Sequence, residues 1–206
     1  MRIVTVSGTC SEVGKTTLVC ELLARLPGWA AIKVTRGHYR SCGRDPDTCC
    51  VSGLLGDEPR VFSDRADTAV ASKDTGRYWA AGAADVRWLV VARGQEGEGI
   101  ARALAGLGDH PGVLIEGNRV VESLDPDLAV MVALAGQKEI KVSARRIVGR
   151  VHGLYVPEGS GADQDPGSLV GAPGAWERPV WGPADLDRLA AGLRREPASA
   201  SIRAGG

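Results

Sequence analysis

The chain has 206 residues, of which 44% are hydrophobic and 24% charged, a composition typical of one globular α/β domain and not of a disordered or fibrous chain. Its 25 basic and 25 acidic residues balance, so no overall field attracts nucleic acid or an anionic membrane surface, and any anion site must be local. No apolar run approaches the roughly 20 residues that a membrane span needs, so we expect neither nucleic acid nor a membrane among the partners.

The first 35 residues predict a strand, a turn, a helix and a second strand. Residues 3–6 form a β-branched run that ends at Ser7 and Gly8. From Lys15 the apolar positions recur at helical spacing until Pro27 and Gly28, and residues 30–34 then have the pattern of another strand. This order is a βαβ unit, which implies a parallel sheet.

Residues 35–71 are polar and irregular, and we assign no helix or strand there. Loops of this length are usually functional or mobile. Three cysteines in this segment, Cys42, Cys49 and Cys50, lack the paired C-x2-C spacing of common zinc sites, so we interpret them as free thiols. The five cysteines are odd in number and too sparse for a disulfide scaffold in a chain of this length. This favours a reducing compartment and a cytoplasmic protein.

The rest of the chain continues to alternate helices with strands. We expect helices over residues 72–81 and 100–108, strands over 86–91, 112–117 and 128–134, and a last helix between Pro183 and Pro197. Continuous apolar strands of this kind belong to a sheet that is covered on both faces. The sequence therefore predicts a three-layer α/β fold with a mostly parallel central sheet over residues 1–196, followed by a disordered tail over 197–206.

One segment carries a recognisable chemistry. Residues 8–17, GTCSEVGKTT, match the phosphate-loop pattern G-x-x-x-x-G-K-[ST] between the first strand and the first helix. Gly8 and Gly14 let the backbone N–H groups face inward, and this nest and the positive end of the helix bind the β-phosphate. Lys15 then neutralises the β/γ oxygens, and the Thr16 hydroxyl ligates Mg²⁺. The pattern predicts a P-loop NTPase fold, whereas the simpler alternative is a glycine-rich turn with an exposed lysine. The predicted nucleotide-binding residues are Gly8, Thr9, Cys10, Ser11, Glu12, Val13, Gly14, Lys15, Thr16 and Thr17.

A second anchor for Mg²⁺ is expected at the carboxyl end of a neighbouring parallel strand. Glu116 ends such a strand, although it could also be an ordinary exposed glutamate. We predict that Lys15 and Glu116 are the catalytic residues and that Thr16 and Glu116 hold the metal. Asp47, or Asp45 beside it, is a further metal candidate, with plain turn aspartates as the alternative.

Two more side chains have open roles. Lys33, at the end of the second strand, could point toward phosphate or toward solvent. His38 could contact substrate or lie on the surface. Gln137-Lys138-Glu139 does not supply the guanine-reading N-K-x-D pattern, so both GTP and ATP stay open.

Four segments resemble a known family. They are residues 8–18, Ala31-Ile32-Lys33 followed by His38, residues 73–83, and Leu114-Ile115-Glu116-Gly117. Together they are similar to the molybdopterin-guanine dinucleotide biosynthesis adaptor family, small P-loop proteins that assist the attachment of a guanine nucleotide to molybdenum cofactor. The resemblance implies that residues 8–17 bind GTP with Mg²⁺, that Glu116 lies near the metal, and that Asp74 lines the site.

This resemblance implies slow Mg²⁺-dependent hydrolysis of a purine nucleoside triphosphate and an adaptor role toward molybdenum-cofactor biosynthesis enzymes. Dethiobiotin synthetase is also similar in residues 9–17 and 116–117, which implies an ATP-dependent ligase as the alternative. A small-molecule kinase, with an acceptor held by residues 35–71, belongs to the same alternative. A regulatory NTPase that forms a homodimer is the third possibility.

Overall fold

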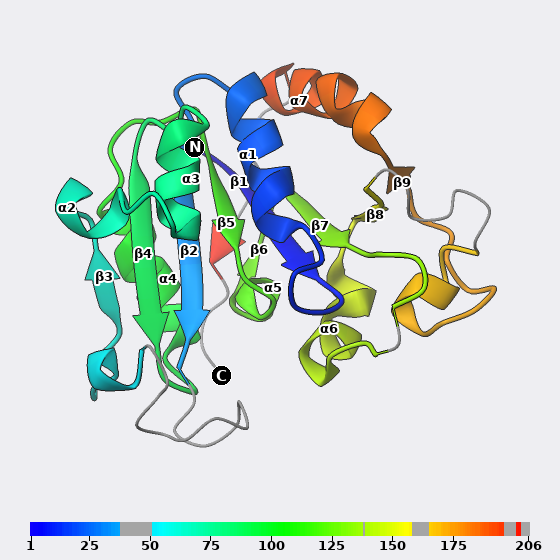
Figure 1. Ribbon diagram of the computed structural model, residues 1–206, viewed down its shortest axis with the longest axis horizontal. Coiled ribbons are helices and arrows are strands. Elements are labelled where there is room, and N and C mark those ends of the chain that lie inside the picture. The colour runs from blue at the N-terminus through cyan, green and yellow to red at the C-terminus, as the bar shows by residue number, and fades with distance from the viewer. Residues whose placement is uncertain (38–50, 138, 158–164, 196–200, 203–206) are drawn as a thin grey trace.

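The architecture combines one large sheet with helices on both of its faces (Figure 1). The computed structural model describes residues 1–37, 51–137, 139–157, 165–195 and 201–202. Strands and helices alternate along most of these residues. The chain is therefore an α/β protein with a mostly parallel sheet, as the sequence predicts.

In the described residues, eight strands form the sheet in the order β3-β4-β2-β5-β1-β7-β8-β9. Neighbouring strands are parallel except β3 and β4, which are antiparallel. Because β1, β2 and β5 are parallel, their carboxyl ends lie along one edge, where ligands of open α/β sheets bind. The bounds are β1 Arg2–Gly8, β2 Ala30–Arg36, β3 Arg60–Phe62, β4 Val86–Val91, β5 Gly112–Glu116, β7 Leu128–Val132, β8 Gly153–Tyr155 and β9 Val180–Trp181.

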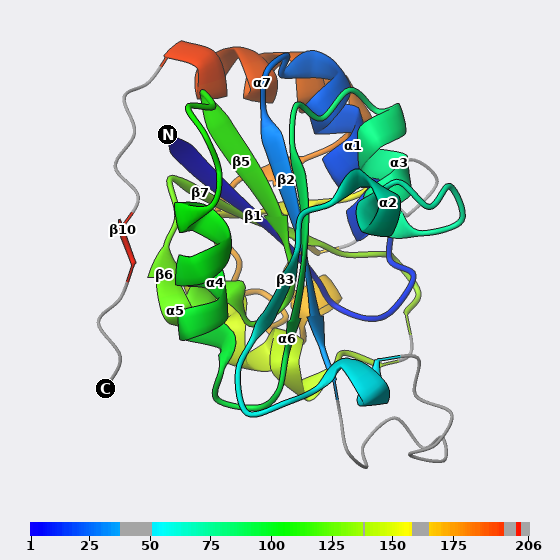
Figure 2. The same ribbon diagram turned by 90° about the vertical axis from the view of Figure 1, so that its left-hand side faces the viewer.

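Helices cover both faces of the sheet, an arrangement compatible with three layers (Figures 1 and 2). One face is packed by α1 (Lys15–Arg25), α3 (Asp74–Ala80) and α7 (Leu186–Arg195). The other is packed by α4 (Glu96–Ala105), α5 (Val120–Ser123) and α6 (Val142–Ile147). No helix in the described part of the chain has both the length and the apolar character needed to cross a membrane. The shorter helical elements are α2 Arg65–Thr68, η2 Ser52–Leu54, η3 Val148–Arg150, η4 Ser168–Val170 and η5 Pro183–Asp185.

Alternating side chains of the central strands pack on opposite faces, because successive residues of a strand point to opposite sides. Val4 and Leu114 are fully buried against the helices of the α1 side, and Val113 is fully buried on the α4 side. This two-sided burial confirms that the apolar runs at residues 3–6 and 112–117 are central strands. It also places Glu116, two residues after Leu114, on the α1 side.

Two predicted helix boundaries are wrong by a few residues. The helix expected from Ser72 begins at Asp74, with Lys73 in the N-cap position. The helix expected to close at Gly108 ends at Ala105, and Leu107 packs against the core from beyond the helix. Ser72 has the character of a capping residue, and Leu107 continues the apolar spacing of the helix, so the sequence pattern extends beyond each helix.

The segment over residues 35–71, for which the sequence predicts no element, contains β3, α2 and η2 in its described part. β3 adds an antiparallel edge to β4, and elements of three or four residues are too short to give a readable periodicity. Residues 38–50 lie outside the described residues. This range includes the candidates His38, Asp45, Asp47, Cys42, Cys49 and Cys50.

In the last seventy residues, β8 and β9 extend the sheet, α7 packs on the same face as α1, and α6 packs on the opposite face. Of the tail predicted to be disordered, the structure describes β10 (Ser201–Ile202), which pairs antiparallel with β6 (Leu124–Asp125). The other residues of 197–206 lie outside the described part.

Candidate functional site

The loop between β1 and α1 has an unusual backbone, and we call residues 8–17 the glycine-rich loop. Gly14 has a φ of 97° and Glu12 a φ of 58°, two left-handed conformations that turn the chain sharply. At Gly8 a Cβ atom would lie 2.5 Å from Val13 Cγ1 and 2.9 Å from Lys15 Cδ, so only glycine fits. Val13 itself is buried in the core cluster on the α1 side of the sheet, and its packing holds the loop against the core.

Lys15 is the first residue of α1 and lies across the loop. Its Nζ donates a hydrogen bond to the carbonyl oxygen of Cys10 at 3.2 Å. Burial lowers the pKa of the Lys15 ammonium, the negative charge of Glu116 raises it in part, and the positive charges of Lys33 and Lys141 lower it further. An ammonium in this position gains stability when a further anion approaches.

Glu116 is the centre of a hydrogen-bonded cluster, although it is only 1% exposed. Its Oε2 accepts a hydrogen bond from Thr16 Oγ1 at 2.9 Å and another from the buried Tyr78 hydroxyl. Its Oε1 pairs with Lys33 Nζ at 2.5 Å. Burial and the charge of Glu116 raise the pKa of Tyr78 well above its usual value, so the phenol is a permanent donor at neutral pH.

Asp74, the first residue of α3, completes the cluster. Its Oδ2 lies 2.6 Å from Lys33 Nζ, and the side chain keeps 38% of its surface exposed. Burial would raise the pKa of Asp74, but hydrogen bonds from Lys33 and Thr16 and the Lys33 charge lower it overall. Burial would likewise lower the pKa of Lys33, and the two carboxylates outweigh that effect and raise it. Lys33 therefore lies between Glu116 and Asp74 as a charged residue.

Residues far along the chain hold the loop from its other side. Asn118 accepts from the Gly8 N–H at 3.0 Å and donates to the Gly8 carbonyl at 2.8 Å. Gln137 accepts from the Thr9 hydroxyl at 2.6 Å, and the Lys141 N–H donates to the Thr9 carbonyl at 2.9 Å. These contacts fix the start of the loop relative to the carboxyl ends of β5 and β7.

The remaining loop residues face solvent or a neighbouring cation. Ser11 Oγ accepts from Lys141 Nζ at 2.6 Å, and Thr17 Oγ1 accepts from Arg77 Nη2 at 3.3 Å. Glu12 is exposed, and Cys10 is half-buried with a free thiol.

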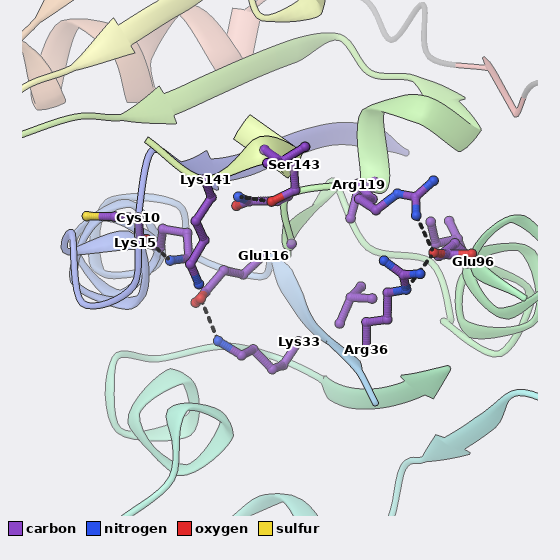
Figure 3. Close-up of a pocket in the computed structure, with 15 residues that line it drawn as sticks. Cys10, Lys15, Lys33, Arg36, Glu96, Glu116, Arg119, Lys141 and Ser143 are labelled. Atoms are coloured by element: carbon purple, nitrogen blue, oxygen red, sulfur yellow. Dashed lines mark hydrogen bonds and ion pairs between the residues drawn. The ribbon is translucent and has the colours of Figure 1, made fainter. Parts of the chain in front are cut away.

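Two cavities open at this edge of the sheet and share Lys15, Lys33 and Glu116. The first, of about 520 Å³, lies between the glycine-rich loop and α3, and Asp74 and Arg77 form its far side. We call it the loop cavity. The second, of about 450 Å³, extends from Cys10 and Lys15 past Glu116 to Arg36, Glu96 and Arg119 (Figure 3). We call it the arginine cavity.

The structure thus brings together part of the predicted site. Thr16 and Glu116 are in contact, Lys15 lies beside them, and Lys33 points into the cluster and not to solvent. Asp47 lies outside the described residues. No group of three or more His, Cys, Asp or Glu side chains in the described part of the chain could hold a metal by itself. The sequence analysis missed Tyr78, Asn118, Gln137, Lys141, Arg36 and Arg119.

No protein-family model matches the chain, and no curated protein matches it.

Proposed function

We propose that the chain is a P-loop NTPase that binds a purine nucleoside triphosphate, GTP or ATP, with Mg²⁺ in the loop cavity. The observation that carries the proposal is the convergence of Lys15, the Thr16 hydroxyl and Glu116 beside a loop whose Gly8 leaves no space for a side chain. Backbone N–H groups at the start of α1 and the desolvated Lys15 ammonium are the partners that a chain of phosphates needs. The residues present therefore fit such a ligand.

The metal would be held by Thr16 together with an acidic residue. Glu116 already has three protein donors, which favours a role in orienting Thr16 and Lys33. Asp74 is more exposed, touches the same threonine, and lines the same cavity, so it is the better partner for Mg²⁺. When bound, the ion would neutralise charge on the phosphate oxygens. With one or two protein oxygens, such a site suits Mg²⁺, which keeps several waters and uses phosphate oxygens as ligands.

Hydrolysis is proposed to be slow. Of the carboxylates that line the two cavities, Glu116, Asp74 and Glu96 are each paired with a lysine or an arginine. The Lys33 ammonium lowers the pKa of Asp74, and a carboxylate of low pKa is a weak general base. Slow turnover fits a protein in which nucleotide binding controls a conformational change or an interaction with another protein. On the resemblance to the molybdopterin-guanine dinucleotide adaptor family, that output is an interaction with molybdenum-cofactor biosynthesis enzymes, with the chain acting alone or as a homodimer.

A ligase of the dethiobiotin synthetase type or a small-molecule kinase is the second candidate. The arginine cavity favours it, because a second space of about 450 Å³ reaches Lys15 from the side opposite α3. Formation of a product that depends on a second substrate would separate an enzyme of this kind from an adaptor.

The test of nucleotide binding is a calorimetric panel of GTP, ATP, GDP and ADP with and without Mg²⁺, on the wild type and on Lys15→Ala. We expect triphosphate binding that requires Mg²⁺, and a loss of at least about a hundredfold in Lys15→Ala, because the cation facing the phosphates is removed. Arg102→Ala on the outer side of α4 is the matched control, since it removes an exposed cation far from the loop. Equal affinity of wild type and Lys15→Ala would refute the proposal. Capture of cofactor-synthesis enzymes from a host extract would then test the adaptor role.

A further inference from the structure

The arginine cavity has two charged ends (Figure 3). One end is formed by Lys15, Lys33 and Lys141 around Glu116, and the other by Arg36 and Arg119 around Glu96. Apolar side chains line the space between them: Val34, Ile100, Val120 and Val142. A volume of about 450 Å³ lies within the range of small-molecule sites.

The arginine end is built by three different elements at the same edge of the sheet. Arg36 is the last residue of β2, Arg119 precedes α5, and Glu96 is the first residue of α4. Val34 and Arg36 lie two residues apart on one strand and share the face of the sheet that α4 covers. Lys33 lies on the opposite face, with α3, so one strand supplies a cation to each side of the sheet edge.

The two guanidinium groups share one carboxylate oxygen and fit it poorly. Arg36 Nε lies 3.2 Å and Arg119 Nη1 lies 3.4 Å from Glu96 Oε1, longer than the 2.7–2.9 Å typical of charge-assisted hydrogen bonds. Within the described residues, Arg36 Nε and Glu96 Oε1 are both buried without a hydrogen-bond partner. The other oxygen of Glu96 accepts the Gly94 N–H at 2.7 Å, which holds the carboxylate in place. The guanidinium forks therefore retain donor capacity that Glu96 does not use.

The charge of the cavity also favours an anion. The side chains that line it include five cations, Lys15, Lys33, Arg36, Arg119 and Lys141, against the two carboxylates Glu96 and Glu116. Outside the lining, Glu122 pairs with Arg119 and Asp74 pairs with Lys33, and each offsets one more positive charge. An excess of positive charge remains in a partly desolvated space. Burial lowers the pKa of Arg36 and Glu96 only partly restores it, as expected for a cation that lacks sufficient anionic partners.

We propose that the arginine cavity binds a small phosphomonoester, with its phosphate on Arg36 and Arg119 and the rest of the molecule directed toward Lys15. Arginine forks bind phosphate oxygens in pairs, and a phosphate group offers them three oxygens where a carboxylate offers two. The proposal that an anion binds here depends only on the residues of the arginine cavity. The reading of this molecule as a second substrate or effector beside the triphosphate rests on the proposed nucleotide site.

The test uses glycerol 3-phosphate, inorganic phosphate and glycerate as probes. Each is titrated by calorimetry into the full chain saturated with Mg²⁺ and a non-hydrolysable GTP or ATP analogue, so that the glycine-rich loop is filled. We expect glycerol 3-phosphate to bind more tightly than the other two. We expect Arg36→Gln and Arg119→Gln to weaken it at least about tenfold, the effect of losing a charge-assisted contact, with nucleotide affinity unchanged.

Two further variants keep the test decisive. Arg36→Lys retains the positive charge beside Glu96 and so protects folding. It loses the two-pronged guanidinium, and we therefore expect it to weaken the binding of glycerol 3-phosphate as well. Arg102→Gln, an exposed cation that pairs with Glu58 and Glu98, is the control and should change nothing. Urea unfolding of each variant establishes that the chain is folded.

Three outcomes would overturn the proposal. One is binding of glycerol 3-phosphate that is indifferent to Arg36 and Arg119. Another is equal affinity for glycerol 3-phosphate and inorganic phosphate, which would assign the cavity to free phosphate. The third is tighter binding of glycerate. The nucleotide site fails separately: if no triphosphate binds, titration without nucleotide still shows whether an Arg36-dependent phosphomonoester site exists.

Discussion

Glu116 is the most deeply buried carboxylate at the site. A carboxylate that is 1% exposed is stable only when it is paired and hydrogen-bonded. Lys33 supplies the charge, and Thr16 and Tyr78 supply two hydroxyl donors to the other oxygen. The Thr16 side chain is therefore oriented by the protein itself, which is what a metal-binding hydroxyl requires if it is to act without reorganisation.

The contribution of the Tyr78 hydroxyl to stability can be tested by comparing the pH dependence of unfolding in wild type and Tyr78→Phe. Because the pKa of Tyr78 is raised in the folded state, its phenol stays protonated above pH 10 while the unfolded phenol ionises, so the contribution to stability is complete below pH 10 and is lost as the pH rises above it. We expect Tyr78→Phe to cost about 1.5–3 kcal/mol at pH 8, where a hydrogen bond to a charged group is lost. This difference from wild type should shrink by about 1.4 kcal/mol per pH unit above pH 10.

Urea unfolding of both proteins between pH 8 and pH 11.5 measures the effect. Other groups titrate equally in the two chains, including Lys33, whose raised pKa also makes stability fall at alkaline pH. They cancel in the difference between wild type and variant. A constant difference across the whole range would show that Tyr78 does not donate to a buried carboxylate.

The residues that could be predicted for the site are those whose position follows from a local motif or from a strand end. Lys15 and Thr16 follow from the spacing of the loop, and Glu116 follows from the rule that parallel strands end at one edge. Tyr78 could not be found in this way, because it reaches Glu116 only through the packing of α3 against α1. Asn118 could have been suspected from the sequence, because it follows Glu116 by two residues and so lies at the same edge of the sheet.

At the scale of elements, the unit formed by β1, the glycine-rich loop and α1 depends on two glycines for different reasons. Gly14 adopts a left-handed φ of 97°, whereas Gly8 lies at the end of a regular strand and is needed only for space. The side chains of Val13 and Lys15 occupy the volume that a Cβ at position 8 would take. The position of Lys15 over the loop therefore depends on Gly8.

Gly8→Ala should displace Lys15 and weaken triphosphate binding by at least about tenfold, with a loss of stability of about 1–3 kcal/mol from overpacking. The matched control is Gly192→Ala in α7, where a Cβ meets nothing within 4 Å. That change should leave nucleotide affinity unaltered and raise stability by up to about 1 kcal/mol, because alanine is the better helix former. Calorimetry and urea unfolding measure both effects. Unchanged affinity in Gly8→Ala would mean that Lys15 does not need its present position.

The sequence predicts long apolar elements well and short ones poorly. β1, β2, β4, β5 and β7 are largely apolar, and the bounds of each lie within about two residues of those expected. β3, β8 and β9 have two or three residues and take their strand conformation from a neighbouring strand, so tertiary pairing and not local pattern decides them. α6 has the same difficulty, with six residues in a segment of mixed periodicity.

At the scale of the whole molecule, α1 connects the site to the carboxyl-terminal part of the chain. Its first residue is Lys15, and at its other end Arg25 pairs with Asp187 at 2.8 Å and accepts a hydrogen bond from Arg194 on its carbonyl at 2.6 Å. Leu193 of α7 is buried in the same core cluster as the apolar face of α1. The eleven residues of α1 place these contacts about 16 Å from the loop.

This separation predicts that the two ends contribute independently to stability. Leu193→Ala should cost about 2–4 kcal/mol through the lost side chain and the cavity it leaves. Mg²⁺-triphosphate at a hundred times its dissociation constant should stabilise the wild type by about 2.7 kcal/mol, and the variant by the same amount within about 0.5 kcal/mol. Urea unfolding of both chains with and without nucleotide gives the four free energies. If the nucleotide stabilised Leu193→Ala much less than the wild type, α1 would transmit strain from α7 to the loop, and α7 would be part of the binding machinery and not only of the core.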